Sequence, residues 1–237
     1  MIHVDLHAHT FFSNCGIHSH VEMLTRARDL GMTALALTDH GPELGGRSSG
    51  IVYDRLHDPV EGVRYLKGME CNIVPHKKTI DLPVELLKYL DVVVVGVHPN
   101  LEKGLGCETY TRMLLEVIEN HPCIDIIAHP NDPNFPLDFE RVAVAAKRRG
   151  IALELNNSKT MLKRAPDSLT RSLVETCINV GCRMVVCSDA HALNELGRDD
   201  AVRPILEELS FPEELEITAN ADRALAFIES RREAKRG

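Results

Sequence analysis

The chain has few aromatic side chains, no paired-cysteine motif and no long apolar run. It lacks tryptophan, and aromatic residues make up 4% of its 237 residues. Its seven cysteines are an odd number without CxxC spacing, which argues against a disulfide framework and favours reduced thiols. The longest apolar run, around residues 92–95, is far too short to cross a bilayer, and no signal-peptide pattern opens the chain. We therefore expect a cytoplasmic protein without a membrane segment.

Positive charge is also in deficit. The formal net charge is −8, which is the opposite sign to that of a protein that binds nucleic acid without regard to sequence. We therefore expect no stable nucleic-acid complex. A small phosphorylated ligand stays compatible with this charge, because bound cations reverse the local potential inside an acidic protein. The length suits one large domain, which we expect to span residues 1–237; the oligomeric state is left open.

Short apolar runs alternate with amphipathic stretches along the whole chain. Several runs are apolar at nearly every position, which suits strands that are covered on both faces. Helical patterns follow them, often with a glycine where a helix would end. Strand followed by helix about seven times predicts a parallel α/β fold. The expected strands are 2–6, 34–37, 65–69, 91–97, 124–128, 151–155 and 183–187, and the expected helices are 21–30, 83–90, 108–119, 138–149, 168–180, 194–209 and 220–232, with a loop over 43–58.

Polar side chains with metal-binding chemistry stand where these apolar runs end. Six of the seven runs are followed by His, Asp or Glu, and the remaining run ends in Asn156 and Asn157, preceded by Glu154. In a parallel barrel all strand C-termini open onto one face, so residues far apart in sequence converge there. An open sheet would spread them along a line. We therefore expect a closed or nearly closed barrel. The residues concerned are Asp5, His7, His9, Asp39, His40, Glu70, His98, His129, Asp189 and His191.

This set of residue types is typical of bound divalent cations. Imidazole suits zinc, iron and manganese, and carboxylates neutralise their charge. His7 and His9 are two residues apart, so on a strand they face the same side. The donors outnumber those that one tetrahedral ion uses, which implies two or more ions, with Glu70 as a candidate bridge. Such a cluster generates hydroxide at neutral pH and stabilises charge on a phosphoryl or acyl centre. We expect a metal-dependent hydrolase.

The motifs that carry these residues resemble those of the PHP (polymerase and histidinol phosphatase) family, in order and over essentially the whole chain. The closest likeness is to the YcdX-type phosphatases. The resemblance implies a distorted (β/α)7 TIM-like barrel and a trinuclear centre of zinc, manganese or iron, with zinc the first expectation. The motifs are Asp5-Leu-His-Ala-His-Thr10, Thr38-Asp-His-Gly41, Gly68-Met-Glu70, Gly96-Val-His98, Ala128-His-Pro130, Glu154-Leu-Asn-Asn157 and Ser188-Asp-Ala-His191.

The resemblance also implies three sets of metal ligands. They are His7, His9, Glu70 and Asp189 for the first ion, Glu70, His98 and His129 for the second, and His40 and His191 for the third. One position departs from the subgroup, which usually has a further histidine ligand where this chain has Cys15. A thiolate is a good zinc ligand, so we favour Cys15 slightly. The alternatives are His18 or His20 from the same loop, or a third site that is weak or empty.

The implied reaction is hydrolysis of a small phosphomonoester by a metal-bound hydroxide, with Asp189 or His191 relaying a proton to the leaving group. Basic residues in the loops on the active-site side are the expected phosphate contacts. An alternative is hydrolysis of another bond, such as a phosphodiester or an amide, because fold alone does not decide between them. Another is a module that serves a nucleic-acid enzyme, which the negative charge and the complete ligand set oppose. The expected phosphate contacts are Arg47, Lys77, Lys78, Lys159 and Arg164.

Overall fold

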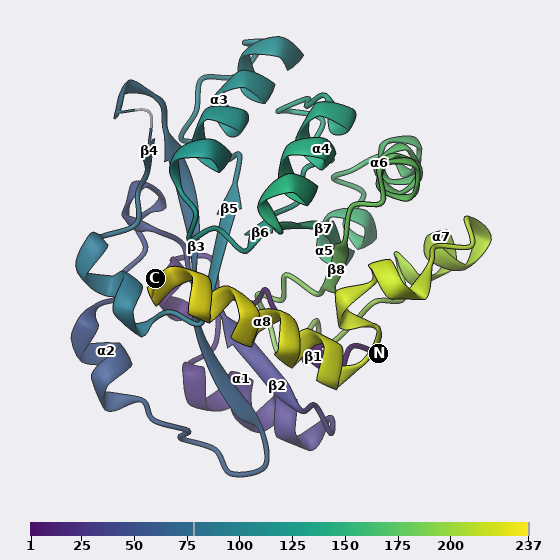
Figure 1. Ribbon diagram of the computed structural model, residues 1–237. Coiled ribbons are helices and arrows are strands. Elements are labelled where there is room, and N and C mark those ends of the chain that lie inside the picture. Colours follow the sequence, from purple (N-terminus) through teal and green to yellow (C-terminus); the bar gives the residue numbers. More distant parts are fainter. Residues whose placement is uncertain (78, 237) are drawn as a thin grey trace.

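Parallel strands in sequence order form the centre of the molecule (Figure 1). The computed structural model describes residues 1–77 and 79–236, with the side chains of all these but 233, 234 and 236. Within that part of the chain, seven parallel strands pair in the order β1-β2-β3-β5-β6-β7-β8, and β4 pairs antiparallel with β3. The strands are β1 Val4–Asp5, β2 Ala34–Leu37, β3 Arg64–Val74, β4 Thr79–Ile80, β5 Val92–Gly96, β6 Ile126–Ile127, β7 Ala152–Asn156 and β8 Met184–Cys187.

The barrel closes at the carboxyl ends of its first and last strands. Ala8 and Ala190, which lie just beyond β1 and β8, form a parallel bridge. The amide of His9 donates to the carbonyl of Ala190 at 2.8 Å, and the amide of Asp189 donates to the carbonyl of His7 at 3.0 Å. These bonds confirm the predicted (β/α)7 TIM-like barrel. They also place two of the predicted ligand motifs side by side at the seam.

Apolar side chains fill the barrel interior. The helix α8 (Ala221–Arg236) covers the end of the barrel at which the strands begin, here called the lower end. Ala224, Phe227 and Ile228 of α8 pack into the same buried cluster as the inward-facing residues of the strands, such as Val94 and Val185. In Figure 1 this helix crosses in front of the strands. Because the lower end is covered, the polar site lies at the opposite end, the upper mouth, where the strands end.

The remaining helices surround the strands, and most of them match the predicted ranges. Ser19 and Glu22 form a capping box at the start of α1, which fixes where that helix begins. Gly150 and Gly181 end α4 and α6 in the left-handed conformation. The α-helices are α1 His20–Asp29, α2 Gly50–Arg55, α3 Cys107–Asn120, α4 Phe139–Arg149, α5 Asn157–Met161, α6 Asp167–Val180 and α7 Arg203–Glu208, and the 3-10 turns are η1 Phe11–Ser13, η2 Pro42–Leu44, η3 Pro75–Lys77, η4 Val84–Tyr89, η5 Glu213–Leu215 and η6 Ile217–Ala219.

Two predicted segments are wrong. The segment expected to be a helix over 194–209 is helical only in α7, because Gly197 has a left-handed φ of 72° and its amide donates to Asp5 instead of to a carbonyl within a helix. The loop expected over 43–58 contains α2, because Tyr53 is buried there and its hydroxyl donates to the carbonyl of Gly68 at 2.9 Å. Among the described residues, no helix is long and apolar enough to span a bilayer.

A buried ion cluster fastens α8 to the barrel. Asp125, next to β6, has a fully buried side chain, and its carboxylate pairs with Arg231 at 3.1 Å and with Lys235. Arg231 also donates to the backbone carbonyls of Ile124 and Arg149. Because these charged groups are buried, each of them needs an oppositely charged or hydrogen-bonding partner for α8 to remain packed on the barrel.

We expect Arg231→Met to lower the free energy of unfolding by about 3–5 kcal/mol, because it leaves a buried carboxylate without one of its partners. Urea denaturation followed by circular dichroism measures this. The matched control is Arg148→Met, which removes an exposed pair with Glu119 and is expected to cost at most about 1 kcal/mol. Equal losses in the two variants would contradict a structural role for the buried cluster.

Candidate metal centre

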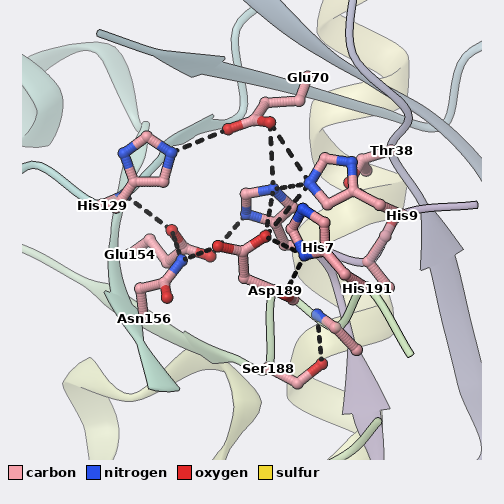
Figure 2. Close-up of polar contacts among 12 residues, drawn as sticks. His7, His9, Thr38, Glu70, His129, Glu154, Asn156, Ser188, Asp189 and His191 are labelled. Carbon is pink, nitrogen blue, oxygen red and sulfur yellow. Dashed lines mark hydrogen bonds and ion pairs between the residues drawn. The ribbon is translucent and has the colours of Figure 1, made fainter. Parts of the chain in front are cut away.

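One carboxylate, that of Glu70, contacts several imidazoles where the barrel strands end (Figure 2). Glu70, on β3, is 1% exposed. Its Oε1 lies 2.9 Å from His98 Nε2 and 3.1 Å from His129 Nε2. Its Oε2 lies 2.8 Å from His40 Nδ1 and 3.4 Å from the Nε2 atoms of both His7 and His9. The strand ends therefore converge as the sequence pattern predicted, with Glu70 between two groups of histidines.

The hydrogen bonds around His7 and His9 define their tautomers. His7 Nδ1 lies 2.7 Å from Glu154 Oε1, and an ionised carboxylate only accepts, so Nδ1 carries the proton. His9 Nδ1 lies 3.0 Å from the hydroxyl of Ser13, which gives its own proton to Asp39, so His9 Nδ1 donates as well. Both Nε2 atoms then present lone pairs, and they lie 3.1 Å apart.

Two facing lone pairs at this distance fit ligands of one cation. Nitrogen atoms about 2.0–2.1 Å from a tetrahedral zinc ion lie roughly 3.3 Å apart. Asp189 Oδ1 joins the pair, at 3.2 Å from His9 Nε2 and 3.6 Å from His7 Nε2. His98 and His129 have a similar separation, with their Nε2 atoms 3.2 Å apart and both close to Glu70 Oε1. The donor set therefore fits divalent cations at two positions that share Glu70.

The pKa shifts of the buried residues indicate that the site stabilises positive charge. Burial lowers the pKa of His7, but the negative charges of Glu154 and Glu70 outweigh it and raise that pKa well above the usual value. Burial raises the pKa of Glu70, but His98 and His7 hold it well below the usual value. The pocket therefore favours positive charge among its ligand atoms, whether this is supplied by protons or by metal ions.

Cys15 joins the outer part of this centre. Its sulfur and one ring nitrogen each of His9, His40 and His191 lie within 4.8 Å of one another. Burial raises the pKa of the Cys15 thiol, but the neighbouring His191 and His40 outweigh it and lower that pKa to about 7. Among the residues considered from the sequence for this position, which are Cys15, His18 and His20, the structure places Cys15 in the cluster.

His18 and His20 lie elsewhere in the described structure. His20 is 4% exposed and its Nε2 lies 3.7 Å from Asp39, with Phe12 and Tyr65 against its ring. The backbone carbonyl of His18 accepts from Phe11, and neither imidazole belongs to the groups of converging ligand atoms found among the described residues.

Two of the converging residues have strained backbones. His129 has a φ of 30° and Asp189 a φ of 51°, in a region where side chains other than glycine are rare. Such conformations cost about 1–3 kcal/mol each and concentrate where function requires a particular side-chain direction. Each lies two residues beyond the end of a barrel strand, and both side chains join the cluster, that of His129 against Glu70 and that of Asp189 against His9.

Residues that orient the candidate ligands were not assigned roles from the sequence. Glu154 bonds His7 through Oε1, and its Oε2 accepts from the amide of His129 at 2.7 Å and from Asn156 at 3.0 Å. Asn156 also donates to Asp189 Oδ2. The sequence feature that could have identified Glu154 and Asn156 is their position at the end of β7. Asp39, which the pattern grouped with the ligands, instead accepts from Thr10 and Ser13 and so holds the loop after β1.

We expect Glu154→Gln to lower kcat/KM and metal affinity by about 10–100-fold, the usual cost of removing a partner that orients metal ligands. The amide cannot accept at both of its ends, so His7 or the amide of His129 loses its bond. Phosphate-release kinetics and equilibrium dialysis with zinc measure the two effects. Glu175→Gln, at an exposed position on α6, is the control and should behave as the wild type; unchanged kinetics in Glu154→Gln would contradict the orienting role.

The predicted phosphate contacts do not join the cluster in the described structure. Arg47 donates to the carbonyl of Phe11 and lies over the rings of Phe11 and Phe12. Lys159 pairs with Asp132 at 2.7 Å. Lys77 and Arg164 are exposed, and Lys78 lies outside the described residues. Substrate contact by these residues stays a prediction.

Comparison with known proteins identifies the family. The model of the PHP domain matches residues 5–129. A probable phosphatase of Caldanaerobacter subterraneus is 34% identical over 234 residues, which cover 97% of this chain and 92% of that protein. The chain belongs to the PHP family. The family predicted from the sequence motifs is confirmed, and the name of this relative agrees with the predicted enzyme class, a metal-dependent phosphatase.

Two solved structures share the PHP fold with this chain. The histidinol phosphate phosphatase of Lactococcus lactis, in complex with zinc, L-histidinol and phosphate, has a TM-score of 0.63 at 16% identity and covers 96% of this chain and 93% of that one. A chain of archaeal ribonuclease P with mature tRNA has the same TM-score at 15% identity and covers 99% of this chain and 93% of that one. At these identities the likeness concerns the fold.

Proposed function

We propose that this PHP chain is a metal-dependent phosphatase that hydrolyses a small phosphomonoester at a centre of two or three divalent cations, with zinc the first candidate and manganese or iron the others. The observation that carries the proposal is the position of Glu70 between paired imidazole lone pairs. A relative named a phosphatase, similar along nearly the whole chain, supports the choice of reaction. We propose that residues 1–237 act as one hydrolase domain.

We propose two inner positions, which the geometry supports. His7, His9 and Asp189 would hold one ion and His98 and His129 the other, with Glu70 shared between them. Bound divalent cations lower the pKa of coordinated water and neutralise charge that builds on a phosphoryl group. The protein's part is to keep these side chains oriented and buried, so that little reorganisation is needed during the reaction.

Asp189 and His191 are the residues predicted to move a proton. Asp189 Oδ2 accepts from Asn156 and its Oδ1 faces His9, so both oxygens are engaged and suit a ligand. The side chain of His191 is 30% exposed, against 9% for Asp189. His191 is therefore the more accessible of the two, and we propose that it passes a proton to the leaving alcohol when its Nε2 holds no metal ion.

The predicted substrate is a small phosphorylated molecule rather than a nucleic acid. Four side chains at the centre, Glu70, Glu154, Asp189 and Cys15, carry single negative charges when ionised. Three divalent cations would exceed these charges and two would balance them, so the mouth can accept a phosphate dianion although the chain as a whole is acidic. The resemblance in fold to a ribonuclease P chain carries no argument for RNA binding here, and the net charge opposes it.

The test is a pair of measurements on one preparation. Elemental analysis after reconstitution should find two or three ions per chain, and an aryl phosphate together with a panel of sugar and amino-alcohol phosphates should release inorganic phosphate. A phosphodiester and an amide serve as comparison substrates. Bound metal with cleavage of the diester or amide, and no phosphate from any monoester, would overturn the proposal. Failure to bind metal would do so as well.

A further inference from the structure

The loop that carries Cys15 is fastened in place from several sides. It follows η1, and Asn14 takes a left-handed φ of 57° while its side chain donates to the carbonyl of Gly45 at 2.9 Å. The amide of Ile17 donates to the carbonyl of His191 at 3.0 Å. The Cys15 sulfur is therefore held beside the outer imidazoles by a folded loop with several anchoring bonds.

The imidazoles around this sulfur offer lone pairs to the same point. His191 Nδ1 lies 2.9 Å from the carbonyl oxygen of Asp189, which only accepts, so Nδ1 carries the proton and Nε2 presents its lone pair. His9 Nε2 lies in the same group, but its lone pair is the one assigned above to the inner position, so the donors left for the outer position are Cys15, His40 and His191. These atoms and the sulfur belong to one group within 4.8 Å, together with a nitrogen of His40.

A second observation also points to a ligand at this place. Glu70 Oε2 is buried, in a residue that is 1% exposed, and it has no hydrogen-bond partner among the described residues. It lies 2.8 Å from His40 Nδ1, which is likewise without a hydrogen bond of acceptable geometry. The two atoms form an ion pair without the geometry of a hydrogen bond, so a cation bound beside them would satisfy their remaining hydrogen-bonding capacity.

We propose that Cys15, His40 and His191 form an outer metal position with a thiolate ligand, and that this position selects zinc over manganese. The inference rests on the proposed metal centre and concerns the identity of its outermost ion. Thiolate is a soft ligand that suits zinc, whereas imidazole and carboxylate, the only donors of the inner positions, also suit manganese. On binding, the sulfur–metal bond replaces the sulfur–hydrogen bond and the proton is released to solvent.

Cobalt substitution tests the thiolate bond directly. Metal-free full-length protein is titrated with Co²⁺, and we expect a sulfur-to-cobalt charge-transfer band in the near ultraviolet. Cys15→Ser should lose this band while the inner positions still bind cobalt. Cys107→Ser is the matched control, because Cys107 is exposed at the start of α3, and it should keep the band. A band of equal strength in Cys15→Ser, or its absence from wild-type protein that holds two or more cobalt ions, would overturn the inference.

Competition between metals tests the selectivity. In a mixture with manganese in large excess, elemental analysis should find more zinc per chain in the wild type than in Cys15→His, which should still bind an ion at the outer position. As much zinc in Cys15→His as in the wild type would refute thiolate selection. Failure of the proposed function gives a different result, in which the cobalt band is present but no phosphomonoester is hydrolysed. If phosphate is released without a band, only this inference fails.

Discussion

Glu70→Gln is expected to abolish phosphatase activity, with a fall in kcat/KM larger than the roughly 100-fold upper range for losing a residue that only orients a ligand. The carboxylate faces five imidazoles through its two oxygens. Glutamine keeps the shape but removes the charge and one of the two acceptor oxygens, so it cannot be shared between two cations. Elemental analysis of the same variant should show less than the wild-type metal content.

Glu43→Gln is the matched control for this variant. Glu43 is exposed on η2, a short turn that follows β2 in the chain. It should retain both activity and metal. If Glu70→Gln kept its full complement of ions and its activity, the central position of Glu70 would have no bearing on catalysis and the proposed centre would have to be abandoned.

Removal of the metal ions is expected to lower the melting temperature by roughly 5–15 °C for each tightly held ion. The range follows from about 2.7–4.1 kcal/mol of stabilisation when free metal is 100–1,000 times Kd and about 2–4 °C per kcal/mol for a chain of this length. His7 and His9 follow β1 and Asp189 follows β8, so an ion held by all three joins the two strands at which the barrel closes. Without it, paired lone pairs and carboxylates face one another across the seam.

Differential scanning calorimetry before and after dialysis against a chelator measures this shift, and return of zinc should reverse it. The Cys15→Ser variant serves as an internal comparison, since its inner ions should give most of the effect. A melting temperature that is unchanged after verified loss of metal would show that no ion bridges β1 and β8.

The sequence pattern predicted the barrel because the alternation of buried strand and amphipathic helix is a local property. The core of β5, Val92–Gly96, is apolar at every position before its final glycine, so its identity depends little on its neighbours. The length of β3 depends instead on β4, a partner formed later in the chain. The end of the expected helix at 194–209 depends on a contact between Gly197 and Asp5, which no window of local sequence contains.

The site was predictable to the same extent. Residues that follow strands had to converge once the barrel closed, and His7, His40, Glu70 and His129 do so. The orienting bonds of Glu154 depend on the side-chain direction at the end of β7, which a sequence motif does not specify. Contact residues for the substrate are still harder to predict from the sequence, because basic side chains such as Lys159 form ion pairs within the protein.

The position of α8 has a consequence for how the molecule is made. The ribosome completes all seven parallel strands before it reaches the helix that covers the lower end of the barrel. Until Phe227 and Ile228 emerge, the interior apolar surface is open to water at that end, so a nascent chain with every metal ligand already synthesised is still an unsealed barrel. We therefore expect the proposed metal centre to hold its ions stably only after this helix has been translated and has packed against the strands.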